Sequence, residues 1–152
     1  MKSRILVLMV VIIMGGCAEQ GTLEQTPRQE STTEFCDFDW KWYSTSSIGY
    51  FDAKSGYQFA VVTIRIVNHT SIPVSTNPFY WELEAESVLY SPHTATFDDS
   101  INSLDAEIRK NGDLTFQIVF EIPKGITRAT LHYTAFSSPQ FRRDESLIED
   151  EE

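Results

Sequence analysis

Cys17 is the residue whose surroundings define its chemistry most clearly. It follows a basic start, an apolar run over residues 5–14 and the small pair Gly15-Gly16, which together are the parts of a cleavable export signal. Small residues before the cleavage point let extended backbone pass the peptidase while the cysteine thiol is alkylated. We therefore expect residues 1–16 to be a signal peptide and Cys17 to carry lipid after cleavage.

The residues around Cys17 resemble the lipobox of bacterial and archaeal lipoproteins, although Met14 stands where leucine is usual. The resemblance implies an exported protein, anchored by fatty acyl chains such as palmitate to the extracytoplasmic face of the cell membrane. Ala18 implies sorting to the outer membrane if the host is Gram-negative. The apolar run is shorter than the ~20 residues that a membrane-spanning helix needs. A plain secretory signal, with Cys17 incidental, is the alternative.

The other residues with catalytic or metal-binding potential are scattered along the chain. His69, His93 and His132 lie in separate segments without the close spacing of zinc ligands. Asp98-Asp99 lacks the spaced acidic loop that surrounds calcium, and all methionines lie in the signal, which removes a thioether copper site. No nucleophile, base and orienting group stand out as a set. We expect no enzymatic activity, no cofactor and no bound metal.

Two residues are eligible for covalent modification. If Cys17 carries lipid, Cys36 has no partner within the chain, and we expect it to be a small buried residue. A disulfide between two chains is the alternative, whereas a Cys17–Cys36 disulfide requires that Cys17 carry no lipid. Asn68 opens the N-glycosylation sequon Asn-His-Thr at the predicted end of a strand, and a plain turn is the alternative there.

Four aromatic residues form a candidate recognition loop. Tyr43, Tyr50, Phe51 and Tyr57 cluster around a segment rich in serine and glycine. Aromatic side chains give large contact areas at a low entropic cost, which suits recognition. Burial of these rings against the core is the alternative.

Composition limits the chain to one folded domain and a few classes of partner. Its 152 residues leave room for a single core. The net charge of −10 disfavours nucleic acid and anionic lipid, whose binding needs cations. Residues 17–34 are polar and predict a flexible tether that follows the lipid. Residues 139–152 predict an acidic, disordered tail, which leaves 35–138 for the domain.

Alternating apolar residues predict about seven short strands and no long helix. The predicted strands cover residues 36–42, 59–67, 79–84, 88–90, 104–109, 114–122 and 129–133. The segment 104–109 also fits one face of a helix, but Asn111-Gly112 is a strong hairpin signal and favours a strand paired with 114–122. Short strands separated by turn residues predict an all-β fold, an antiparallel two-sheet sandwich, with a barrel as the alternative.

The order of these features resembles a known family over roughly Tyr57 to Tyr133. The residues that carry the resemblance are Gly56-Tyr57-Gln58-Phe59, the strand with Val62, Ile64 and Ile66 ending at Asn68, then Pro73, Phe79, Asn111-Gly112 and the run from Phe116 to Pro123. The chain is similar to the telokin-like, immunoglobulin-like domains of unknown function in exported bacterial and archaeal lipoproteins. Ala85-Glu86-Ser87 replaces the usual Asp-Gly turn, and Asn111 replaces a common proline.

The resemblance implies an immunoglobulin-like sandwich and a noncatalytic module of the cell envelope. Together with the signal and the tether, it supports one hypothesis for function: the domain binds an envelope protein or polymer. A sensor or scavenger of small ligands or cations, using the acidic loops, is the alternative. The fold alone names no ligand.

Overall fold

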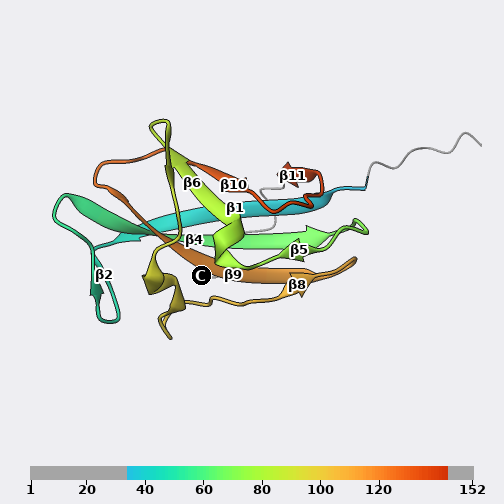
Figure 1. The fold of residues 1–152 in the computed structure, drawn as a ribbon, viewed down its shortest axis with the longest axis horizontal. Helices are drawn as coiled ribbons and strands as arrows, with labels where there is room; N and C mark the ends of the chain where they lie inside the picture. The colour runs from blue at the N-terminus through green and yellow to red at the C-terminus, as the bar shows by residue number, and fades with distance from the viewer. Residues whose placement is uncertain (1–33, 144–152) are drawn as a thin grey trace, which may run out of the picture. The chain divides into compact units, whose positions relative to one another are not determined.

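The computed structural model describes residues 34–143 (Figure 1). The predicted signal peptide 1–16, Cys17, the tether up to residue 33 and residues 144–152 lie outside the described residues.

The larger sheet has four strands in the order β11-β1-β4-β9. Their bounds are Phe141–Arg143 for β11, Cys36–Thr45 for β1, Tyr57–Asn68 for β4 and Asp113–Pro123 for β9. β4 pairs antiparallel with both of its neighbours, whereas β11 pairs with β1 in parallel. β4 is rich in β-branched and aromatic residues, which suit the middle of a pleated sheet. This long strand carries Phe59 near its start and Asn68 at its end, and both residues are discussed below.

The smaller sheet has three strands in the order β10-β6-β7. Their bounds are Thr130–Tyr133, Trp81–Ala85 and Val88–Tyr90, respectively. The β6–β7 hairpin turns through Glu86 and Ser87, which both have positive φ, as the twist of a two-residue hairpin requires.

Short elements close the loops around the two sheets. Two-residue strands form the pairs β2 (Ser47–Ile48) with β3 (Phe51–Asp52) and β5 (Val74–Ser75) with β8 (Glu107–Ile108). The 3₁₀ helices are η1 (Pro78–Tyr80) and η2 (Thr94–Phe97).

The main core lies between the two sheets. Alternate residues of β4 and β9, among them Ile64 and Phe116, face β6 and β10, and β6 contributes Trp81 and Leu83 to this core. A second, smaller core lies on the opposite face of the large sheet, where Phe59, Val61 and Val119 pack against Ala95 of η2 and against Ile101. Close packing of alternate side chains on both faces explains why the middle of β4 is apolar at consecutive positions.

The predicted two-sheet sandwich is confirmed. Seven strands have three or more residues, which agrees with the expected number. The inward set Ala60, Val62, Ile64 and Ile66 is buried as predicted. The immunoglobulin-like strand topology stays a prediction.

Three details of the prediction are wrong. Phe79 belongs to η1 and is 69% exposed, so the third strand begins at Trp81. In the segment 104–109 only β8 is a strand, and it pairs with β5 instead of forming a hairpin with β9. The predicted tail starts too early, because β11 joins the large sheet through ion pairs as well as backbone hydrogen bonds.

Candidate functional site

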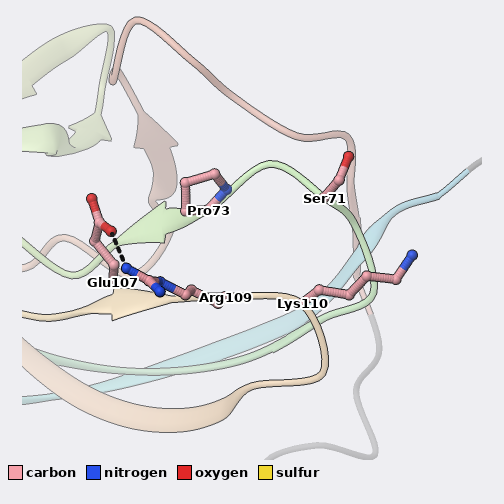
Figure 2. A pocket seen from close by; sticks show the side chains of 5 residues that line it. All are labelled: Ser71, Pro73, Glu107, Arg109 and Lys110. Carbon is pink, nitrogen blue, oxygen red and sulfur yellow. Dashed lines mark ion pairs between the residues drawn. The ribbon is translucent and has the colours of Figure 1, made fainter.

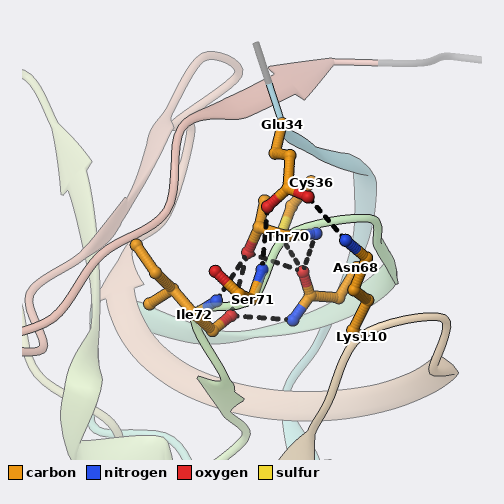
Figure 3. A network of polar contacts seen from close by, with 7 residues as sticks. All are labelled: Glu34, Cys36, Asn68, Thr70, Ser71, Ile72 and Lys110. Carbon is orange, nitrogen blue, oxygen red and sulfur yellow. Dashed lines mark hydrogen bonds and ion pairs between the residues drawn. The ribbon is translucent and has the colours of Figure 1, made fainter. Parts of the chain in front are cut away.

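Asn68, the last residue of β4, is the centre of a buried polar network (Figure 3). Its Nδ2 donates to the Ile72 carbonyl at 2.9 Å and to the Ile108 carbonyl at 2.8 Å. Its Oδ1 accepts from the Thr70 backbone N–H at 2.8 Å and from the Cys36 thiol at 3.1 Å. Both donors and both lone pairs of the amide are therefore used, which also fixes its orientation. The side chain ties the loop after β4 to the end of β8.

Burial of Asn68 overturns its role as a glycosylation acceptor. The residue has no exposed surface, and a glycan would replace one of the two N–H groups that hold the loop. The sequon therefore marks a structural asparagine in the folded protein. The turn that we considered as the alternative is present, and the Thr70 hydroxyl of the same sequon also bonds the Ile72 carbonyl.

Cys36 is a free, fully buried thiol within the same network. This agrees with the expectation of a small buried residue and leaves its sulfur inaccessible to a second chain. Burial raises the pKa of the thiol to about 11, because the charged thiolate is disfavoured away from water. Cys36 is thus an inert hydrogen-bond donor at neutral pH.

An open pocket of about 420 Å³ lies beside this network (Figure 2). It is lined by Ser71, Pro73, Glu107, Arg109 and Lys110, so its two walls are the loop after β4 and β8 with the turn that follows it. Figure 2 shows Arg109 extending toward Glu107 and Lys110 extending the other way along the same wall. The Arg109–Glu107 ion pair is long, at 4.0 Å, and the arginine side chain is 84% exposed.

Glu34, which lies just before β1, contacts two residues of the pocket lining, Lys110 and Ser71 (Figure 3). One carboxylate oxygen pairs with the ammonium of Lys110, and the other accepts the backbone N–H of Ser71 at 3.2 Å. The hydrogen bond from Lys110 lowers the pKa of Glu34, and the Ser71 N–H lowers it further. A backbone N–H and an ammonium thus converge on one carboxylate at this position.

A tight turn places Arg109 and Lys110 on the pocket wall. Asn111 has φ of 66°, and the Gly112 N–H donates to the Arg109 carbonyl. The turn also continues the ladder of β4, because the Asn68 backbone exchanges hydrogen bonds with residues 111 and 112. A Cβ at Gly112 would approach the Arg109 carbonyl oxygen to 2.9 Å, so the turn requires glycine. The Asn-Gly pair was recognised correctly as a turn, although it joins two different sheets.

The end of the large sheet nearest the pocket is fastened by ion pairs. Arg142 of β11 bonds the Asp37 carboxylate at 2.7 Å, and Arg143 bonds Asp39 at 3.1 Å. His69 Nε2 lies 3.0 Å from the second oxygen of Asp37. Both aspartates are nearly buried, so these partners offset the loss of hydration.

The four aromatic residues of the predicted recognition loop differ in exposure, and their role in recognition stays a prediction. Tyr50 is fully exposed at the tip of the β2–β3 hairpin, and Tyr43 and Tyr57 are partly exposed on β1 and β4. Phe51 packs against the second core and contacts the His93 ring edge-on. No ring contact joins the four to one another within residues 34–143. Of the four rings, Phe51 alone packs against a core, and it is partly buried there.

The histidines and the acidic loop take structural roles. His132 lies 2.8 Å from Glu84, and the His93 ring accepts the Ala95 N–H at the start of η2. The Ser100 hydroxyl and backbone N–H lower the pKa of Asp98. Among the described residues, no group of three or more histidine, cysteine or acidic side chains is placed to hold a metal ion.

Neither the pocket nor the position of Glu34 beside it is predicted by the sequence patterns. The adjacent cations Arg109-Lys110 in an acidic chain were an available signal. The meeting of Ser71, Pro73 and Glu107 with them depends on the β5–β8 pairing, which no local pattern predicted.

The domain is similar in fold to a solved structure. A solved structure from Bacillus subtilis subsp. subtilis str. 168, described as a "putative lipoprotein (ycdA)", is similar with a TM-score of 0.58 and 14% identity. The match covers 70% of this chain and 34% of that one, so this chain spans about a third of its relative's length. At this identity the likeness shows the fold alone. No curated protein matches the chain in sequence.

The described residues contain no helix that is long and apolar enough to cross a membrane. The family model described as "Domain of unknown function (DUF4352)" matches residues 37–143, a wider span than the resemblance seen in the sequence. With its matched region spanning the two sheets and both walls of the pocket, the chain belongs to the DUF4352 family of domains of unknown function.

Proposed function

We propose that the protein is an exported lipoprotein, anchored through lipid on Cys17 to the extracytoplasmic face of the cell membrane. In this proposal its β-sandwich binds an envelope protein or polymer without catalysing a reaction. The observation that carries the binding role is the open pocket lined by Ser71, Arg109 and Lys110 at one end of the sandwich. The export signal and the description of the Bacillus relative as a lipoprotein support the anchoring.

The chemistry of the pocket favours binding over catalysis. Its side chains are two cations, one carboxylate, one hydroxyl and a proline ring. Among the described residues that line the pocket there is no histidine or cysteine to act as a base or nucleophile, and Ser71 donates its N–H to Glu34. A few polar groups beside an apolar ring are typical of a recognition site.

Anchoring is tested by cell fractionation of the full-length protein. Cys17→Ser removes the thiol that would carry lipid, and we expect the variant to leave the membrane fraction. Cys36→Ser is the matched control, because Cys36 is buried in the domain and serine keeps a donor for Asn68. Retention of Cys17→Ser in the membrane, at the level of Cys36→Ser, would contradict the anchoring.

Binding is tested by crosslinking in living cells followed by mass spectrometry. We expect the tagged protein to capture a recurrent envelope component, and Lys110→Glu to reduce that capture by reversing the charge of the pocket wall. Lys124→Glu makes the same change at the exposed turn just after β9, at the other end of that strand from Lys110, and should capture as the wild type does. Equal capture by the two variants would exclude the pocket as the binding site.

A further inference from the structure

The position of Glu34 is a ready-made carboxylate site. The Ser71 N–H comes from the loop after β4, and the Lys110 ammonium comes from the turn after β8. The two groups belong to different walls of the pocket yet point at the two oxygens of a single carboxylate (Figure 3). A backbone N–H and an ammonium form charge-assisted hydrogen bonds with any carboxylate of suitable reach.

The pocket is lined by further groups, beyond the two that bond Glu34, that a ligand could contact. Arg109 lines the same wall, is 84% exposed and approaches Glu107 only to 4.0 Å, so its guanidinium is available for a second anionic oxygen. The Pro73 ring adds an apolar surface next to it (Figure 2). A volume of about 420 Å³ has room for a ligand much larger than one carboxylate.

The walls of the site are held in place before any ligand arrives. Asn68 bonds the Ile72 carbonyl in one wall and the Ile108 carbonyl in the other, at 2.9 and 2.8 Å. Both bonds are buried from solvent or nearly so. A preorganised site loses less conformational entropy when a ligand binds.

The charge of the pocket stands out against the rest of the domain. Within residues 34–143, neighbouring cations occur only at Arg109-Lys110 and Arg142-Arg143. The second pair is committed to the nearly buried carboxylates of Asp37 and Asp39. Arg109-Lys110 is therefore the pair that an anionic ligand can reach in a chain of net charge −10.

We propose that this pocket binds a carboxylate-bearing ligand, and that Glu34 holds the place of the ligand's carboxylate while the pocket is empty. The inference rests on the proposed binding function and names the ligand class for the same site. An incoming carboxylate takes the Ser71 N–H and the Lys110 ammonium, and Glu34 turns out to solvent. Arg109 then bonds a second polar group of the ligand.

Displacing Glu34 from Lys110 costs little free energy, but Glu34 still competes with the ligand for the site. The Glu34–Lys110 pair is exposed, and exposed ion pairs contribute little stability. Glu34 nevertheless competes effectively, because only one residue separates it from the start of β1 and its local concentration is high. Neutralising Glu34 should therefore tighten ligand binding by about 2–5-fold.

The test is a titration of the full-length, ¹⁵N-labelled protein followed through the Ser71 and Lys110 amide signals. The probes are succinate, a triglutamate peptide and inorganic phosphate. We expect saturable shifts with succinate or the peptide in the millimolar range, and tighter binding by Glu34→Gln. The tighter of the two carboxylate probes distinguishes a small metabolite from an acidic peptide segment as the ligand's source.

Matched variants separate the site from general charge effects. Glu86→Gln removes an exposed carboxylate at the β6–β7 turn and should bind as the wild type does, whereas Lys110→Met should lose the saturable shift. Equal affinity of Glu34→Gln and the wild type would overturn the placeholder role, and phosphate binding as tightly as the carboxylates would overturn the ligand class. If the titration shows no carboxylate binding but crosslinking still captures an envelope partner that depends on Lys110, the proposed function stands and the carboxylate site is wrong. If the titration succeeds but crosslinking captures no partner, the carboxylate site stands and the proposed function is wrong.

Discussion

The two ends of the β4–β9 ladder are held together by different forces. At the end that contains Phe59 and Val61, both faces of the sheet are covered, by the main core on one side and by η2 on the other. At the end that contains Asn68, one face is apolar and the other carries the exposed Arg65–Asp113 ion pair. The loops at this second end depend on hydrogen bonds to one amide. Packing on both faces makes the Phe59 end a rigid scaffold. At the Asn68 end, hydrogen bonds to one amide hold the loops while charged groups stay exposed.

Phe59→Ala tests the packed end and should have the largest effect. Deleting a fully buried ring leaves a cavity between η2 and the sheet, and we expect a loss of about 3–5 kcal/mol in the free energy of unfolding. Urea denaturation measures this loss. Phe136→Ala is the control, because that ring is fully exposed and its removal should change stability by less than about 0.5 kcal/mol. Similar losses for the two variants would refute the packed-end description.

Asn68→Ala tests the polar end and should cost about 2–3 kcal/mol, less than the loss of Phe59. The substitution deprives the Ile108 carbonyl, the Thr70 N–H and the Cys36 thiol of the amide in a buried place, and it leaves the Ile72 carbonyl with the Thr70 hydroxyl alone. The amide signals of Ser71 and Lys110 should shift, whereas those at Phe59 should stay unchanged. Asn102→Ala removes an asparagine side chain bonded at the surface and should cost about 1 kcal/mol or less. A cost no greater than this for Asn68→Ala would show that the two walls do not depend on the amide.

Alkaline pH should weaken the polar end specifically, with the smallest effect of the three. Burial raises the pKa of Cys36 from 9.0 to about 11. Below pH 9 the folded and unfolded thiols both keep their proton, so the contribution to stability is fully present. It is lost as the pH rises toward and through about 11, because the unfolded thiol ionises first. We expect the wild type to lose about 1 kcal/mol more than Cys36→Ala between pH 7 and pH 10.

Urea denaturation of both proteins at the two pH values measures this difference. The Cys36→Ala protein keeps every tyrosine, including Tyr133, whose pKa burial raises, so the comparison removes the tyrosine contribution that does not depend on Cys36. Repulsion from the Cys36 thiolate also raises the Tyr133 pKa, and this coupling counts as part of the Cys36 effect. Parallel pH profiles for the two proteins would show that Cys36 does not couple ionisation to folding.

The main core was largely predictable from the sequence, and the polar end was not. The alternation of Ala60, Val62, Ile64 and Ile66 reports directly which face of a strand is buried, because the side-chain period of a strand is two. β11 has no such pattern in Phe-Arg-Arg, since it is fixed by Asp37 and Asp39 from the opposite part of the chain.

The site itself failed to show in the sequence for the same reason. Asn68 was noted as a glycosylation sequon, because its short-range pattern is that of a modified surface residue. Its real partners, Cys36 and Ile108, come from distant segments. The Asn111-Gly112 turn was identified correctly, but its local signal cannot say that β8 pairs with the two-residue strand β5. Long-range polar contacts of this kind carry no periodicity.

The parallel pairing of β1 with β11 has a mechanical consequence. Because the two strands run in the same direction, a pull between the start of β1 and the end of β11 slides one strand along the other. The backbone register from Cys36–Phe141 to Phe38–Arg143 and the two aspartate–arginine pairs then share the load at the same time. Opening one bond after another, as in a peeled hairpin, is avoided. The first and last strands of the sandwich thus form a clasp that resists tension applied through the ends of the domain.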